Sequence, residues 1–135
     1  MSDIYRKEIV QHIIRNLLDI QLLRIIQAQP TWGYKIKKQV EVDFNIKLRH
    51  GALYPTLNSL EEKGFVESSK QQKDGRIRKV YTLTENGKIY LQTYYSILQG
   101  QLESNKITNN TLEITQPTTD MIISKSKNQL ALEVP

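Results

Sequence analysis

Residues 48–65 have the sequence LRHGALYPTLNSLEEKGF, and this stretch decides the fold of the chain. Leu53, Leu57 and Leu60 recur at helical spacing, which predicts an amphipathic helix over about residues 51–63 with the leucines facing inward. An ordinary solvated face would mix Lys and Glu, but the first turns of this outer face carry small, flat or hydrogen-bonding side chains. These are Gly51, Tyr54, Pro55, Asn58 and Ser59. A face of this kind allows another molecule to come close.

Two residues limit this helix. Pro55 is tolerated only near the first turn, where its missing N–H removes no helical hydrogen bond, so the helix is expected to start close to Gly51. Gly64 supplies the left-handed stop after the last turn, because glycine adopts positive φ without steric cost.

Two helical regions are predicted upstream. Residues 4–28 carry Ile and Leu in two neighbouring stripes, which indicates a helix buried on more than one side. This region forms either one helix or two helices with a break near residues 16–19. Thr31 is a plausible N-cap for a short helix over residues 32–43, and residues 46–48 are expected to form a very short strand.

A hairpin and a last helix are predicted downstream. Asp74-Gly75 is a strong turn signal between two strand-like segments, so the residues around it should form a β-hairpin with a polar, basic tip at 71–78. Thr84 is expected to cap a helix over residues 85–104. Its apolar face is too wide for the surface helix of a monomer. The polar composition of residues 105–135 predicts a flexible or loosely docked tail.

Charge and composition narrow the function. The 135 residues carry a net charge of +5 with a pI near 9.4, and the basic excess lies in residues 31–83. A basic block favours an anionic partner, most often nucleic acid, although a basic chain without special meaning gives the same total. There is no cysteine, so disulfides, thiolate catalysis and Cys-ligated zinc are excluded. No membrane-spanning run or secretion signal is recognised, which predicts a cytoplasmic protein.

The order of elements is helix, helix, helix, basic hairpin, helix, which describes a mainly α winged helix-turn-helix fold. One α-helix fits the major groove of B-DNA, and a β-ribbon can reach the neighbouring groove or the backbone. The sequence therefore predicts double-stranded DNA as a partner. Asn58 can pair with adenine, and Arg49 and His50 sit at the positive end of the helix, where phosphate is favoured. The predicted DNA contacts are Lys35, Lys38, Arg49, His50, Gly51, Tyr54, Asn58, Ser59, Lys73, Arg76, Arg78 and Lys79.

Each of these contacts has a plainer alternative. Tyr54 and Pro55 could pack on the hairpin and set the entry of the helix. Asn58 and Ser59 could simply be solvated, as could the hairpin cations. Trp32 could line a ligand pocket, but a lone tryptophan at a turn is more often a packing anchor.

Several segments together resemble the PadR family of transcriptional regulators. They are WGYKIKKQVE at residues 32–41, LRHGALYPTLNSLEEKGFVES at 48–68 and DGRIRKVYTLTENGK at 74–88. The resemblance spans about residues 17–95. It implies a dimeric winged-helix DNA-binding protein, usually a repressor, whose N- and C-terminal helices build the dimer. The family often has His where Trp32 stands and Ser-Pro where Arg49-His50 stand, so the operator cannot be inferred from the family.

The apolar stripes of the terminal helices favour the same dimer. Pairing the surplus apolar surface of 4–28 and 85–104 across a two-fold axis would bury it, and two recognition helices would then match an inverted repeat. The predicted interface residues are Ile9, Ile13, Leu17, Tyr90, Leu91, Tyr94 and Leu98. The tyrosines could instead fill the intramolecular core. The predicted organisation is a DNA-binding domain at 1–83, a dimerisation helix at 84–104 and the tail at 105–135.

Other functions are weaker hypotheses. The chain shows no Ser/His/Asp set, no HExxH, no phosphate-binding loop and no paired catalytic carboxylates, so no enzyme, cofactor or metal site is expected. A winged-helix module that binds another protein is the alternative to a DNA-binding regulator. The sequence does not identify a small-molecule effector.

Overall fold

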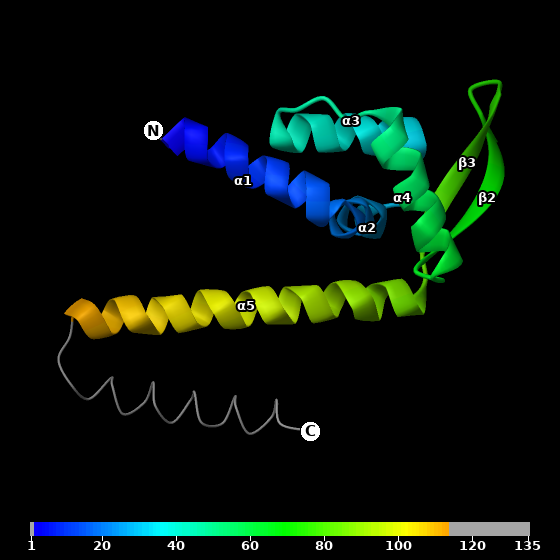
Figure 1. Cartoon of the computed structure of the whole chain (residues 1–135). Helices are drawn as coiled ribbons and strands as arrows, with labels where there is room; N and C mark the ends of the chain where they lie inside the picture. The colour runs from blue at the N-terminus through cyan, green and yellow to red at the C-terminus, as the bar shows by residue number, and fades with distance from the viewer. Residues whose placement is uncertain (1, 114–135) are drawn as a thin grey trace. The chain divides into compact units, whose positions relative to one another are not determined.

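The computed structural model describes residues 2–113, and the side chains of residues 2–105. Its contacts divide the chain into two compact units, Met1–Thr93 and Tyr94–Pro135. Along the chain the elements are α1 Ser2–Asn16, α2 Leu18–Ala28, β1 Thr31–Trp32, α3 Gly33–Phe44, α4 His50–Glu62, β2 Val66–Lys73, β3 Arg76–Leu83 and α5 Glu85–Glu113 (Figure 1). The prediction of a mainly helical chain with a β-hairpin is confirmed.

The Ile/Leu-rich region forms two helices, which decides between the two alternatives. The backbone leaves the helical region at Leu17, between α1 and α2. In α1 the buried residue is Val10, whereas α2 buries most of its length against the rest of the first unit. Consequently α2 is the central helix of the core, and α1 keeps much of its apolar surface exposed.

The helices α3 and α4 form the helix-turn-helix. Ile36 and Val40 are the buried residues on the inner face of α3, and Asn45 ends it in the left-handed conformation at φ 53°. Residues 46–48 form a loop, so the predicted strand there is wrong. The backbone N–H of Leu48 donates to Oε2 of Glu41 at 2.8 Å, and this bond supplies the hydrogen-bond partner that a strand would have provided.

Helix α4 follows the leucine pattern. Leu53, Leu57 and Leu60 are fully buried or nearly so, which confirms the predicted inner face. The helix starts at His50 with Pro55 in its second turn, and it makes no side-chain cap bond within the described residues. Gly64 follows it at φ 78°, as the predicted stop requires.

The hairpin belongs to a three-stranded antiparallel sheet with the order β1-β3-β2. Asp74 and Gly75 both have positive φ, 53° and 76°, which is the geometry of a type I′ turn. The third strand is β1, in which Thr31 pairs with Tyr81. Thr31 therefore lies inside the sheet and does not cap α3, contrary to prediction. The base of the ribbon is buried and its tip is exposed; the tip extends beyond the helices of the first unit (Figure 1).

The start of α5 is fastened to the base of the hairpin. The hydroxyl of Thr84 accepts the N–H of Gly87 at 3.0 Å and donates to the carbonyl of Gly64 at 2.6 Å, so the predicted cap is confirmed. A Cβ at Gly87 would lie 2.1 Å from the carbonyl oxygen of Phe65, so only glycine fits this contact.

The last helix is longer than predicted. It continues past residue 104 to Glu113, because no Gly or Pro interrupts residues 101–113. The first nine residues of the predicted tail are therefore helical. The rest of that tail, residues 114–135, lies outside the described residues.

Candidate nucleic-acid interface

The outer side of α4 and the strand β3 of the hairpin line one groove of about 650 Å³. Tyr54 and Asn58 line it from α4, and Arg76, Arg78 and Lys79 line it from β3. The remaining lining residues are Trp32, Gly33, Tyr34, Ile77 and Tyr81. We call this the basic groove. It brings together five of the side chains that the sequence singled out from two separate stretches.

Tyr54 is held at the floor of the basic groove. A Cβ at Gly33 would lie 2.8 Å from Cε1 of Tyr54, so glycine at 33 is what lets the phenol lie across the start of α3. The imidazole of His50 stacks on the phenol with ring centroids 5.7 Å apart. Tyr54 thus packs against Gly33 and His50 and still exposes part of its ring, and its contact with DNA stays a prediction.

The outer face of α4 divides into two sides. Asn58 lies with Tyr54 on the hairpin side, whereas Gly51 and Pro55 line a separate hollow together with Gln11 and Arg15 of α1. The division follows from helix geometry, because residues 51 and 55 form one i, i+4 row and residues 54 and 58 form the adjacent row. Arg49 is exposed and Ser59 is half-buried.

Three cations surround the single tryptophan. The Trp32 ring centroid lies 4.3 Å from the Arg78 guanidinium carbon, 5.1 Å from the Lys73 ammonium and 5.2 Å from the Lys35 ammonium. Lys38 lies 5.5 Å from the ring of Tyr34 in the same way. These rings hold the cations at the groove through cation–π attraction.

The sequence did not lead us to place Trp32, Tyr34 and Tyr81 in the basic groove, although all three line it. Trp32 was expected to be a packing anchor, and Tyr34 and Tyr81 were not among the predicted DNA contacts. Trp32 is half-buried, as an anchor would be, and it also lines the groove. A usable signal was present in the sequence, since WGYKIKK places aromatic side chains within one turn of three lysines.

Lys79 has a different environment from the other hairpin cations. Its ammonium lies 3.1 Å from Oε1 of Glu61 on α4, and the hydroxyl of Ser68 on β2 donates to the other carboxylate oxygen. These two hydrogen bonds lower the pKa of Glu61, and the bond to Glu61 raises the pKa of Lys79. Lys79 therefore holds the hairpin against α4, and much of its charge is compensated before any ligand arrives.

The Glu41 carboxylate of α3 holds the chain just before the start of α4. The N–H of Leu48 and the nearby ammonium groups, Lys37 first among them at 3.9 Å, lower the pKa of the Glu41 carboxyl. Because Leu48 lies just before α4, this carboxylate fixes the turn between α3 and α4. Nothing in the local sequence pattern indicates this bond, since the partners are seven residues apart.

The predicted interface residues divide into exposed and buried ones. Ile9 is 57% exposed, and Leu17 and Leu98 also have exposed side chains; Ile13 and Tyr94 are half-buried. Leu91, by contrast, is 0% exposed. It is a core residue of the first unit, which corrects its assignment to an interface. The two stripes of α5 are both apolar, so the sequence pattern could not separate them.

Tyr90 makes part of its contacts within its own chain. Its ring stacks on Phe65 with centroids 4.4 Å apart, and its hydroxyl donates to Oδ2 of Asp19 at 3.5 Å. Partial burial, with the Asp19 carboxylate beside it, raises the pKa of the phenol. Tyr90 therefore contributes to the core as well as presenting an exposed edge.

The described residues include neither a candidate metal site nor a candidate membrane-spanning helix. No group of three or more His, Cys, Asp or Glu side chains that could hold a metal ion occurs there. Within residues 2–113, no helix combines the length and apolarity needed to cross a bilayer.

The residues that form the helix-turn-helix and the hairpin are also those that match known proteins. Residues 22–93 match the sequence profile described as "Transcriptional regulator PadR-like family". A protein of Lysinibacillus sphaericus, described as uncharacterized, is 34% identical over 82 residues, which cover 58% of this chain and 75% of the relative. A crystal structure of a PadR family transcription regulator from Clostridium difficile is 30% identical, with a TM-score of 0.59 over 70% of this chain and 96% of that one. The structure of a PadR-like transcription factor from Bacteroides fragilis shares the fold, with 18% identity and a TM-score of 0.61 over 73% and 96% of the two chains.

Proposed function

This chain belongs to the PadR-like family of transcriptional regulators, and we propose that it represses transcription by binding an inverted-repeat DNA operator as a homodimer. The family is one of regulators, not of enzymes. The observation that carries the proposal is the basic groove, in which the outer side of α4 and the cations of β3 face the same space. We also propose that it acts in the cytoplasm.

The contacts of the basic groove divide by chemistry. Arg76, Arg78 and Lys73 are proposed to bind phosphates, because guanidinium and ammonium groups neutralise the DNA backbone. Lys35 and Lys38 extend this basic surface along α3. Together these five cations would supply sequence-independent affinity.

Helix α4 is proposed to supply sequence preference. The amide of Asn58 is exposed in the groove and can form a bidentate pair with adenine, and Tyr54 and Ser59 offer hydroxyls nearby. Arg49 and His50 lie at the positive end of α4, where they would bind a phosphate. Gly51 leaves room for the backbone, since a Cβ there would meet no described atom within 4 Å.

The proposed role of Lys79 is positional. Its ammonium pairs with Glu61, so it orients the hairpin relative to α4 instead of binding phosphate directly. Removing Lys79 would free the hairpin from α4. It would also leave the Glu61 carboxylate unpaired, where it would repel the phosphates of the DNA backbone.

The homodimer is proposed from the exposed apolar side chains of α1 and α5. Ile4, Ile9, Ile97 and Leu102 are all more than half exposed within one chain. Apolar surface exposed to this degree is normally buried against a partner. A two-fold axis would bury it and would duplicate the basic groove.

The direct test is fluorescence anisotropy of a labelled duplex of arbitrary sequence over a range of salt concentrations. The wild-type chain is expected to bind at low salt and to be released by added salt. The double variant Arg76→Ala/Arg78→Ala should bind more weakly, and the slope of log K against log salt should become shallower by about 2 units.

Lys88→Ala is the matched control, since it removes a positive charge from α5, where Lys88 pairs with Glu85 outside the groove. Its salt slope should stay close to that of the wild type. Absence of salt-sensitive binding by the wild-type chain, or an equal loss in the control, would contradict the proposal and favour a module that binds protein.

A further inference from the structure

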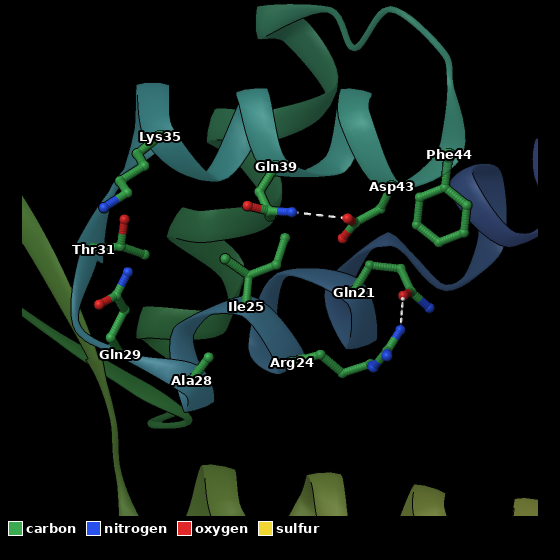
Figure 2. Close-up of a pocket in the computed structure, with 10 residues that line it drawn as sticks. All are labelled: Gln21, Arg24, Ile25, Ala28, Gln29, Thr31, Lys35, Gln39, Asp43 and Phe44. Carbon is green, nitrogen blue, oxygen red and sulfur yellow. Dashed lines mark hydrogen bonds between the residues drawn. The ribbon is translucent and has the colours of Figure 1, made fainter.

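A second cavity, of about 250 Å³, lies between α2 and α3 (Figure 2). Its volume corresponds to about eight water molecules in the liquid, which is the size of a small metabolite. Ile25 and Ala28 of α2 form one wall, and Gln39 of α3 lies opposite. The cavity shares no lining residue with the basic groove.

One end of the cavity holds an unpaired buried hydroxyl. Thr31 is 1% exposed, and its Oγ1 has no hydrogen-bond partner among the described residues. Buried hydroxyls are nearly always hydrogen-bonded, so this atom indicates a partner that the chain itself does not provide. Figure 2 shows the Thr31 hydroxyl together with the Lys35 ammonium and the Gln29 amide at this end. A hydroxyl donor beside a cation suits one small anionic group.

The opposite end carries groups of both charges, the Asp43 carboxylate and the Arg24 guanidinium. The amide of Gln39 donates to Oδ1 of Asp43 at 2.8 Å, which leaves the carboxylate able to accept further hydrogen bonds. The guanidinium of Arg24 at this end is engaged by Oε1 of Gln21 at 2.9 Å. Lys35 and Asp43 lie about 12 Å apart along the axis of α3. The two charged side chains therefore mark opposite ends of the cavity along α3.

We propose that this cavity binds a short carboxylate that carries a hydrogen-bond donor, hydroxyl or ammonium, at its other end. The carboxylate accepts hydrogen bonds from the Lys35 ammonium and the Thr31 hydroxyl. The donor binds Asp43, and the apolar body lies against Ile25 and Ala28.

The ligand would act on DNA binding through Lys35, and this step rests on the proposed function. The Lys35 ammonium lies 5.2 Å from the ring of Trp32, and that ring lines the basic groove. A carboxylate in the cavity neutralises Lys35 and draws its ammonium away from the DNA side. Linkage then requires that the ligand weakens DNA binding and that DNA weakens ligand binding by the same factor.

The site is tested first on the protein alone, by calorimetric titration with 5-aminopentanoate and 5-hydroxypentanoate. Pentylamine lacks the carboxylate and pentanoate lacks the donor. Saturable binding of at least one bifunctional probe, with weaker binding of both truncated ones, is expected. Trp32 emission should change in parallel, because the cation beside its ring moves. Binding of neither bifunctional probe, or equal binding of pentylamine, would overturn the inference.

Variants assign the contact atoms. Lys35→Gln is expected to weaken probe binding by about ten- to hundredfold, since it removes a charged hydrogen bond. Thr31→Val removes only the hydroxyl and should also weaken binding, while its unfolding midpoint stays equal to or above that of the wild type. Lys37→Gln removes the same charge two residues along α3, outside the cavity, and serves as control. Unchanged affinity in both Lys35→Gln and Thr31→Val would overturn the assignment.

A second titration separates the site from its consequence. Operator affinity is measured with and without saturating probe. A decrease in the wild type that is absent in Thr31→Val supports the coupling, and an unchanged affinity in a protein that binds the probe overturns the coupling while supporting the site. A chain that binds the probe but no DNA would contradict the proposed function and leave the cavity assignment supported.

Discussion

Helices α4 and α5 are both amphipathic and both carry leucines and tyrosines, but they expose opposite faces. In α4 the leucines are buried within the chain, and Tyr54 and Asn58 on the polar face are exposed. In α5 the side chains of Ile89, Ile97 and Leu102 are 63%, 62% and 57% exposed. The leucines of α4 are therefore explained by the fold of one chain, whereas the apolar side chains that α5 leaves exposed are the reason why we propose a homodimer.

The largest effect is expected from the inner face of α4. Leu57→Ala should lower the free energy of unfolding by about 2–5 kcal/mol, because it removes buried methyl groups and leaves a cavity. Urea unfolding followed by circular dichroism measures this. Val42→Ala on α3 is the control, since Val42 is 76% exposed and its truncation should cost less than about 0.5 kcal/mol. Similar losses in both variants would break the distinction between buried and exposed apolar residues.

The next effect concerns the outer apolar side of α5. Ile97→Ser and Leu102→Ser should each weaken the dimer by about tenfold or more, because each removes an apolar side chain from the proposed interface. Sedimentation equilibrium should show a shift toward monomer while the helical signal of the monomer is retained. Gln101→Ser changes an exposed polar residue of the same helix and should leave the dimer constant unchanged. A wild-type chain that sediments as a monomer would remove the basis of the two-fold model.

The smallest effect tests the bond between α4 and the hairpin. The pKa of Glu61 is lowered in the folded chain, so its pairing stabilises the fold above the ordinary glutamate range and the stabilisation is lost as the pH falls through the lowered value. Between pH about 5 and 3, the wild type should therefore lose more stability than Glu61→Gln. The pair is partly exposed, so the difference should stay under about 1 kcal/mol.

Thermal unfolding at a series of pH values measures this difference. Glu62→Gln, at the neighbouring exposed position, is the control and should follow the wild type. Parallel pH profiles for the wild type and Glu61→Gln would show that the carboxylate contributes nothing to the position of the hairpin.

Local pattern was sufficient for the elements whose signals lie within one turn of chain. The leucine spacing of α4, the stop at Gly64, the Asp74-Gly75 turn and the Thr84 cap were all predicted, because each depends on backbone preferences of adjacent residues. The two-residue strand β1 was missed, since its only definition is pairing with β3, about fifty residues later.

The candidate site was harder to predict than the fold. The sequence suggested which side chains could bind DNA, and the structure brings Asn58 and Arg78 to one groove. The pairing of Lys79 with Glu61, the burial of Leu91 and the cavity behind Lys35 depend on how helices pack, for which the sequence has no periodic signal.

We propose that α4 and the hairpin act together on DNA, twice in a symmetric pair. The most direct measurement is selection of binding sequences from a random DNA pool by the full chain, followed by sequencing. The account predicts enrichment of inverted repeats whose half-sites are centred about one helical turn, roughly 10 base pairs, apart. Enrichment of unpaired single sites, or no enrichment at all above the starting pool, would contradict it.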